Sequence, residues 1–84
     1  MSNKIQKKVI NLISNISNKD IEKIHMHDIL YTHCFDSLDI LTLLIELNYE
    51  FGIDIKENEF TEDNTIDFIV NLIGNKIKER DEKR

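Results

Sequence analysis

Residues 36–52 read DSLDILTLLIELNYEFG, and this stretch decides the fold. Asp36 and Ser37 are residue types that start helices, because their side-chain oxygens accept backbone N–H groups of the first turn. Gly52 tolerates the left-handed conformation that is common just past a helix end. The stretch therefore predicts one helix that begins at Asp36–Ser37 and stops at Gly52.

This predicted helix has two apolar stripes. At about 100° per residue, five apolar side chains fall on one side and four on nearly the opposite side. The first stripe is Ile40, Leu43, Leu44, Leu47 and Phe51; the second stripe is Leu38, Leu41, Ile45 and Tyr49; an acidic flank between them holds Asp39, Glu46 and Glu50. One stripe is enough to join a core. The second stripe is either additional core or a surface kept for a partner. We favour the partner, because every helix of so short a chain lies at the periphery.

Helical spacing also marks a segment on each side of residues 36–52. The first predicted helix has one apolar face and fades in the polar stretch 14–20; its face is Ile5, Val9, Leu12, Ile13 and Ile16. The last helix starts after a cap at Asn64 or Thr65; its apolar face is Ile66, Ile69, Val70, Ile73 and Ile77. Asn58 to Glu62 can form a short helical turn. The sequence thus predicts an all-α, antiparallel four-helix bundle of three longer helices and one short one.

The connection between the first two predicted helices is unusually long and has no clean period. Loops above ~12–15 residues are uncommon unless they are functional. Tyr31 and Phe35 are expected to pack this connection onto the bundle.

Composition narrows the classes of function. The chain has 84 residues, enough for one domain, and a net charge of −5, which disfavours nucleic acid and favours partners with basic surfaces. No apolar run approaches the ~20 residues of a membrane span, and no export signal precedes the first helix. Cys34, the single cysteine, suits the reducing cytoplasm. We expect a cytoplasmic monomer.

Ser37 is the candidate functional residue. A serine at a helix start is usually a cap, but Asp36 can do the capping and free the Ser37 hydroxyl. A phosphate attached there would meet the positive end of the helix dipole and free N–H groups.

The chain resembles the acyl carrier proteins over nearly its whole length and order of elements. The resemblance rests on Asp36-Ser37-Leu38-Asp39-Ile40, the apolar helix that follows, and Glu50-Phe51-Gly52-Ile53-Asp54-Ile55. It implies a carrier, not an enzyme: a phosphopantetheinyl transferase moves 4'-phosphopantetheine from coenzyme A onto Ser37 Oγ. The thiol of the arm then holds an acyl or aminoacyl group as a thioester. Residues 1–77 would form the carrier domain and residues 78–84 a charged, frayed tail.

The resemblance also implies a docking surface on the helix. Its partners would be the transferase, an acyl- or aminoacyl-loading ligase or transferase, and condensing or acyl-transfer enzymes. The implied docking residues are Asp36, Leu38, Asp39, Leu41, Ile45 and Glu46.

The sequence departs from the common carriers next to the serine. His33-Cys34-Phe35 replaces the Leu-Gly that usually precedes Asp-Ser-Leu in fatty-acid carriers, and the Gly-Gly-His or Gly-Gly-Asp more common in peptidyl carriers is also missing. Glu59-Phe60-Thr61 is faintly similar to D-alanyl carriers. We therefore expect a carrier of a specialised dissociated pathway, for a fatty acid, polyketide or related product. The alternatives are a peptidyl or D-alanyl carrier and, from another class, a non-carrier helical adaptor.

Three further patterns do not amount to sites. His25, His27, His33 and Cys34 fit no common zinc spacing. His33 and Cys34 lack the third orienting group that nucleophilic catalysis needs. Glu62, Asp63 and Asp67 lack the glycine and the glutamate spacing of a calcium loop. The sequence thus predicts no metal site and no catalytic residue.

Overall fold

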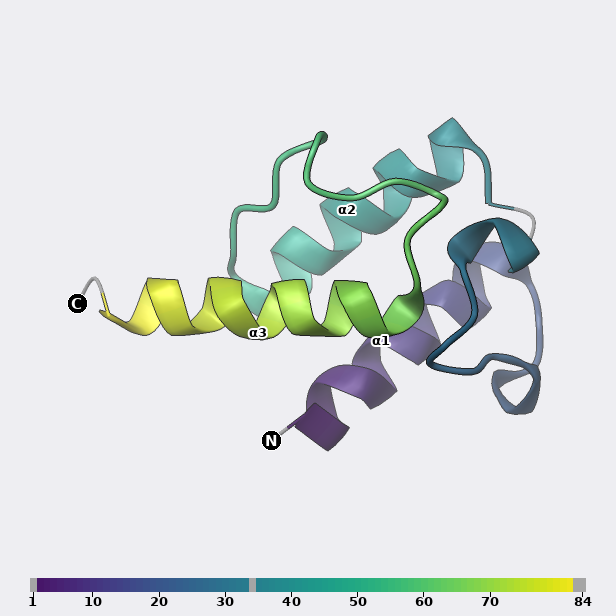
Figure 1. Ribbon diagram of the computed structural model, residues 1–84, viewed down its shortest axis with the longest axis horizontal. Helices are drawn as coiled ribbons and strands as arrows, with labels where there is room; N and C mark the ends of the chain where they lie inside the picture. Colours follow the sequence, from purple (N-terminus) through teal and green to yellow (C-terminus); the bar gives the residue numbers. More distant parts are fainter. Residues whose placement is uncertain (1, 34, 83–84) are drawn as a thin grey trace.

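The computed structural model describes residues 2–33 and 35–82 (Figure 1). Cys34 and residues 83–84 of the expected tail lie outside the described residues. Three α-helices make up the fold: α1 at Ser2–Ser17, α2 at Ser37–Phe51 and α3 at Ile66–Glu82. Two short 3-10 helices, η1 at Ile21–Lys23 and η2 at Leu30–His33, lie in the α1–α2 connection. The described residues form no strand beyond an isolated bridge between Ile29 and Thr65. The all-α class predicted from the sequence is confirmed.

Helix α1 is the common neighbour of the other two helices. It packs against both α2 and α3 and runs opposite to both (Figure 1). Helices α2 and α3 run in the same direction, so the antiparallel prediction is wrong for this pair. The cause is the connection 52–65, which returns along α2 before α3 begins. An extended chain rises about 3.3 Å per residue and a helix about 1.5 Å, so this connection can span the helix.

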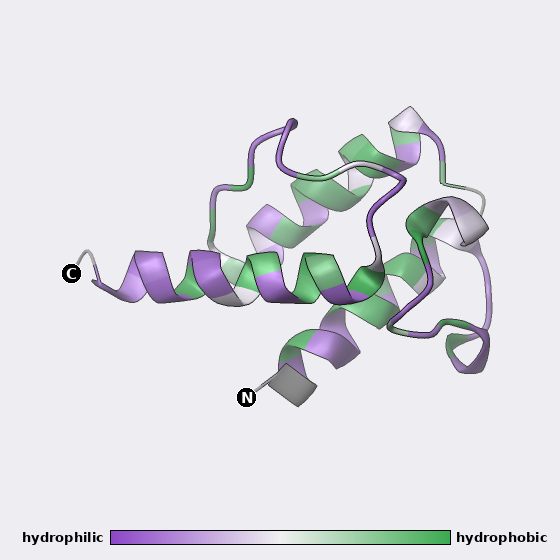
Figure 2. Cartoon of the chain, in the orientation of Figure 1, coloured by the Kyte–Doolittle hydropathy of each residue, from purple (hydrophilic) through white to green (hydrophobic). Residues whose placement is uncertain are grey.

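The core draws on all three helices and on both connections. Its members share near-complete burial: Val9, Ile13, Ile24, Leu30, Phe35, Leu43, Leu44, Leu47, Ile55, Phe60, Ile66, Ile69, Val70 and Ile73. Each connection therefore contributes apolar side chains that hold it against the helices. Figure 2 shows that α3 changes from largely apolar residues near its start to hydrophilic ones at its C-terminal end.

The ends of the helices follow the local signals in the sequence. Gly52 adopts a left-handed conformation (φ 61°, ψ 42°), and its N–H donates to the Asn48 carbonyl. Asn18, just past α1, is also left-handed, with φ 60°. Thr65 Oγ1 accepts the Phe68 N–H at 3.0 Å, so Thr65 caps α3. The predicted start and stop of α2 are confirmed.

The short helical turn expected at Asn58–Glu62 is replaced by two turns, one on each side of Phe60. Glu59 Oε2 accepts the Lys56 N–H at 2.8 Å, and Asn64 Oδ1 accepts the Thr61 N–H at 2.8 Å. Side chains that bond nearby backbone groups in this way compete with helix formation. The short helices of this fold lie instead in the α1–α2 connection.

Two other expectations differ from the structure. Phe35 is buried, as expected, but the Tyr31 side chain is exposed; Tyr31 holds the connection through its backbone N–H, which donates to the Glu62 carbonyl at 2.9 Å. Helix α3 continues past Ile77 to Glu82, so residues 78–82 are helical. None of the helices in the described part of the chain combines the length and apolar character needed to span a bilayer.

Candidate functional site

The start of α2 is capped without the help of Ser37. Asp36 Oδ1 accepts the Asp39 N–H at 3.0 Å, and Asp39 Oδ2 accepts the Asp36 N–H at 3.4 Å, which together form a capping box. Ser37, the first residue of the helix, is exposed, and its hydroxyl has no hydrogen-bond partner among the described residues. The prediction that Asp36 frees Ser37 from capping is confirmed.

The two stripes of α2 have opposite environments. In the first stripe, Leu43, Leu44 and Leu47 are buried, and Ile40 and Phe51 are half-buried. In the second stripe, Leu38, Leu41, Ile45 and Tyr49 are 70%, 42%, 59% and 87% exposed. The second stripe is therefore not additional core. Exposed apolar side chains in a continuous row are the usual sign of an interaction surface.

The acidic flank of α2 is divided between structural contacts and solvent. Glu50 forms an ion pair with Lys8 of α1. Asp39 is half-buried and belongs to the capping box, whereas Glu46 is exposed. Asp39 and Glu46 line a shallow depression against α1. Of the predicted docking residues, Asp36, Leu38, Leu41, Ile45 and Glu46 are exposed along α2, and Asp39 is partly covered.

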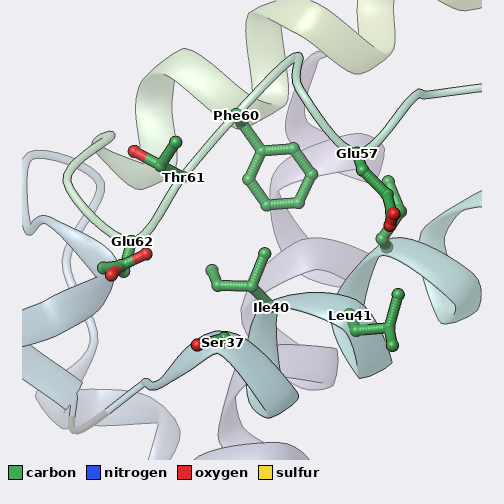
Figure 3. Close-up of a pocket in the computed structure, with 8 residues that line it drawn as sticks. Ser37, Ile40, Leu41, Glu57, Phe60, Thr61 and Glu62 are labelled. Atoms are coloured by element: carbon green, nitrogen blue, oxygen red, sulfur yellow. The ribbon is translucent and has the colours of Figure 1, made fainter.

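A pocket of about 360 Å³ lies directly beside Ser37 (Figure 3). One wall comes from α2 and the other from the connection 52–65; the lining residues are Ser37, Ile40, Leu41, Leu44, Glu57, Phe60, Thr61 and Glu62. The Phe60 ring points from the connection toward Ile40, while Glu57 and Glu62 lie at opposite sides of the opening. Glu57, Phe60 and Glu62 could not be assigned to the site from the sequence, because they reach Ser37 only through the return of the chain along α2.

The connection that forms the outer wall is attached to α2 by one side chain. Asn48 Oδ1 accepts the Ile55 N–H at 2.8 Å, and Asn48 Nδ2 donates to the Ile55 carbonyl at 3.1 Å. Asn48 thus bonds both the N–H and the carbonyl of one residue, as the backbone of a neighbouring β-strand would. It fixes the connection at the C-terminal half of α2, and Ile55 is buried there.

A partly buried polar pair lies within the α1–α2 connection. His33 is almost fully buried, and its Nε2 donates to Asp28 Oδ2 at 3.0 Å. The pKa of Asp28 is lowered, first by the His25 N–H that donates to the same oxygen at 2.9 Å and then by His33. His33 therefore lies inside the fold, where it holds two parts of the connection together.

The histidines do not assemble a metal site among the described residues. His25 and His27 stack with ring centroids 5.9 Å apart, and no group of three metal-binding side chains occurs in residues 2–33 and 35–82. Cys34, the fourth member of the zinc pattern considered above, lies outside this part of the chain.

Comparison with known proteins identifies the family. The family model described as the phosphopantetheine attachment site matches residues 7–73, which include the whole of α2 and the pocket beside Ser37. A curated acyl carrier protein is 35% identical to this chain over 90% of its length. The chain belongs to the acyl carrier protein family. Members of this family hold 4'-phosphopantetheine covalently. The protein is accordingly a carrier and not a catalyst.

Curated relatives agree with this assignment along most of the chain. An acyl carrier protein of Buchnera aphidicola subsp. Schizaphis graminum is 35% identical over 77 residues, covering 90% of this chain and 98% of the relative. An acyl carrier protein of Rickettsia bellii is 32% identical over 71 residues, covering 82% and 86%. One from Cylindrotheca sp. is 42% identical over 45 residues, covering 54% and 56%. The carrier role implies contact with transferases and acyl-handling enzymes.

Proposed function

We propose that Ser37 is the attachment point of phosphopantetheine and that this carrier delivers thioester-linked acyl or aminoacyl groups between the enzymes of a dissociated pathway. The observation that carries the proposal is the exposed Ser37 hydroxyl in the first turn of α2, left without a capping role by Asp36. Its position inside the matched residues 7–73 supports the same assignment. When bound, the arm supplies the thiol that holds the cargo.

The local electrostatics suit a phosphodiester on Ser37. Among the described residues, the N–H groups of Ser37 and Leu38 have no acceptor, and they sit at the positive end of the α2 dipole. The carboxylates of Asp36 and Asp39 are directed to backbone N–H groups by the capping box, and Glu57 and Glu62 also line the pocket beside Ser37. An anionic group on Ser37 is therefore attracted by the helix end, while the capping bonds partly offset the charge of the two carboxylates.

We propose the second stripe with its acidic neighbours as the docking surface. Leu38, Leu41 and Ile45 supply apolar contact area, and Asp36, Asp39 and Glu46 supply negative charge for partners with basic patches. Such contacts are expected to be weak, fast and sensitive to salt. The proposed partners are a phosphopantetheinyl transferase, a loading ligase or transferase, and condensing or acyl-transfer enzymes.

We propose that the chain acts as a monomer in the cytoplasm, for a specialised pathway of fatty acid, polyketide or related synthesis. The lone cysteine fits a reducing compartment. A specialised pathway is supported by the stretch before Asp36, where His33-Cys34-Phe35 replaces the Leu-Gly of fatty-acid carriers.

The test is modification by a broad-specificity transferase in the presence of coenzyme A, followed by intact mass. We expect a mass gain of one phosphopantetheine on the full chain and none on Ser37→Ala. Ser17→Ala is the matched control, because Ser17 lies at the end of α1 and its hydroxyl donates to the Ile13 carbonyl. An unchanged mass for the natural chain, with a transferase shown to be active on another carrier, would favour the helical adaptor.

A further inference from the structure

A second cavity lies where the first half of α1 meets the end of α2 and the middle of α3. Its volume is about 590 Å³, and it shares no lining residue with the pocket beside Ser37. Phe51, the last residue of α2, lines this cavity, whereas Ser37 is the first residue of the same helix. At a rise of about 1.5 Å per residue, the two ends of α2 are about 20 Å apart. The cavity is therefore separate from the proposed attachment site.

The floor of this second cavity is apolar. It is formed by Ile5, Phe51, Val70 and Ile77. Val70 is buried, and the other three side chains are half-buried, so part of this apolar surface is in contact with water. Covering such surface is favourable at roughly 25 cal/mol per Å². The volume lies within the ~300–1,000 Å³ typical of pockets that bind small molecules, so the floor can hold an alkyl chain.

Gly74 lies in the α3 wall of the second cavity and helps to keep it open. Glycine is a poor residue for a helix interior, because it loses more backbone freedom on folding than alanine does. A Cβ at position 74 would have no atom within 4 Å, apart from its chain neighbours and the backbone of its own helix. Close packing therefore does not require a glycine here. The effect of the missing side chain is to leave room in the cavity.

The polar part of the lining is positive, although the chain as a whole is negative. It consists of Lys4 and Lys8 of α1 and the amides of Asn71 and Asn75 of α3. In the part of the chain that the structure describes, no acidic residue lines the cavity. Helix α1 carries three lysines and no acidic residue, whereas the whole chain has 16 acidic and 11 basic residues. The charge of this cavity therefore favours an anion.

The two lysines of the lining differ in their partners. Lys8 pairs with Glu50, and its Nζ lies 6.0 Å from the centroid of the Phe51 ring. Lys4 is exposed, and its ammonium group has no ion pair with any of the described residues. Lys4 is thus a cation that an incoming carboxylate can reach. The amides of the lining can add hydrogen bonds to the same carboxylate.

We infer that this second cavity is a non-covalent binding site for a free, apolar monocarboxylate, of which octanoate is the probe. The alkyl chain lies on the apolar floor, in the space left by Gly74, and the carboxylate pairs with Lys4. The inference does not depend on the attachment of an arm to Ser37, because the ligand is free and the cavity does not include that residue.

The experiment titrates octanoate and, separately, octanol into the isotope-labelled full chain without an arm, and records the chemical shifts of the backbone amides. We expect saturable shifts at residues 4–8, at Phe51 and at residues 70–77. Octanoate should bind about threefold more tightly than octanol, because only octanoate has a charge to pair with Lys4. Shifts centred on Ser37 and residues 57–62 would place the ligand in the other pocket and overturn the inference. Binding that did not saturate below about 2 mM octanoate would also overturn it.

Two variants at Gly74 test whether the space above it is the binding site. Gly74→Leu fills this space and should weaken octanoate binding at least about tenfold. Gly74→Ala separates binding from folding: it should raise the thermal midpoint by up to about 4 °C, because alanine is the better helix former, and still weaken octanoate binding about threefold. Octanoate affinity that neither variant lowered would overturn the inference.

Lys4→Gln tests the position of the carboxylate. It should weaken octanoate binding about threefold and leave octanol binding unchanged, because only the charged ligand loses a partner. Lys7→Gln is the matched control, since Lys7 is an exposed lysine of the same helix that does not line the second cavity. It should change neither affinity. Equal weakening of octanoate binding by the two variants would show that net charge alone attracts the acid, and would overturn the pairing with Lys4.

Discussion

The two stripes of α2 consist of similar apolar residues, but one is buried and the other is exposed. Leu43 and Leu47 of the first stripe are fully buried, whereas Leu38 and Ile45 of the second stripe are largely exposed. Both stripes repeat at the helical period, so nothing within α2 itself separates them. The difference is what the rest of the chain places against each side: α1, α3 and the returning connection meet the first stripe. In a chain of this size, apolar character marks a contact surface, and tertiary structure decides whether that contact is internal.

The largest expected effect is on the free energy of unfolding. A truncation in the first stripe should lower it strongly, and the same truncation in the second stripe should not. Leu47→Ala should lower the free energy of unfolding by about 2–5 kcal/mol, because it removes buried methyl groups and leaves a cavity. Leu38→Ala, the same chemical change in the second stripe, should cost less than about 1 kcal/mol. Urea denaturation of the two variants measures both values. Equal losses would mean that the second stripe is covered in solution, for example by a second copy of the chain.

The next effect concerns binding and leaves folding intact. Leu41→Glu should slow modification of Ser37 by a phosphopantetheinyl transferase by about tenfold, equivalent to about 1.4 kcal/mol, because it places a charge in the proposed apolar contact. The helical circular dichroism signal should not change, since Leu41 is 42% exposed.

Thr42→Glu is the control for this charge. Thr42 is the next residue along the helix, is exposed, and lies on the side that faces α1. Thr42→Glu adds the same charge outside the second stripe and beside Asp39 and Glu46, so the rate of modification should not fall below about half that of the natural chain. If both variants were slowed alike, net charge would explain the result, and an unchanged rate for Leu41→Glu would remove the second stripe from the docking surface.

The parts of the structure that could be predicted are those with local causes. The bounds of α2 follow from Asp36 and Gly52, whose side-chain and backbone preferences act within one turn of the helix end. The freedom of the Ser37 hydroxyl follows from the same capping bond. These features need no knowledge of the rest of the fold, and the sequence was sufficient for them.

The parts that could not be predicted depend on contacts between distant segments. Phe60 joins the site only because the connection returns along α2, and the turns around it form because Glu59 and Asn64 bond the backbone. His33 is buried although it is polar, because Asp28 satisfies its Nε2–H, whereas the Tyr31 side chain is exposed. Periodicity gives the apolar character of a segment but does not say which segment it will meet.

The smallest effect concerns the ion pair between Glu59 and Lys76, which attaches the connection 52–65 to α3. The pKa of Glu59 is lowered, first by the Lys56 N–H and then by Lys76, and the pKa of Lys76 is raised chiefly by Glu59. A lowered carboxyl pKa stabilises the fold above the ordinary value of 4.5, and the contribution is lost as the pH falls through the lower folded value. A raised amine pKa stabilises below 10.5, and that contribution is lost as the pH rises through the higher folded value. The ion pair therefore makes its full contribution to stability between about pH 4.5 and 10.5.

Glu59→Gln should lower the free energy of unfolding at pH 7 by less than about 1 kcal/mol, since both side chains of the pair are partly exposed. Because the variant has no carboxyl to titrate at this position, the difference from the natural chain should shrink as the pH falls below 4.5. Asp54→Asn serves as the comparison, because it removes a carboxylate that is largely exposed and pairs with Lys56 within the same connection. A difference between Glu59→Gln and the natural chain that stayed constant from pH 7 down to pH 3 would show that Glu59 acts through packing alone. The connection 52–65 would then be held against the first stripe by the burial of Phe60 and Ile55, with no contribution from the ion pair.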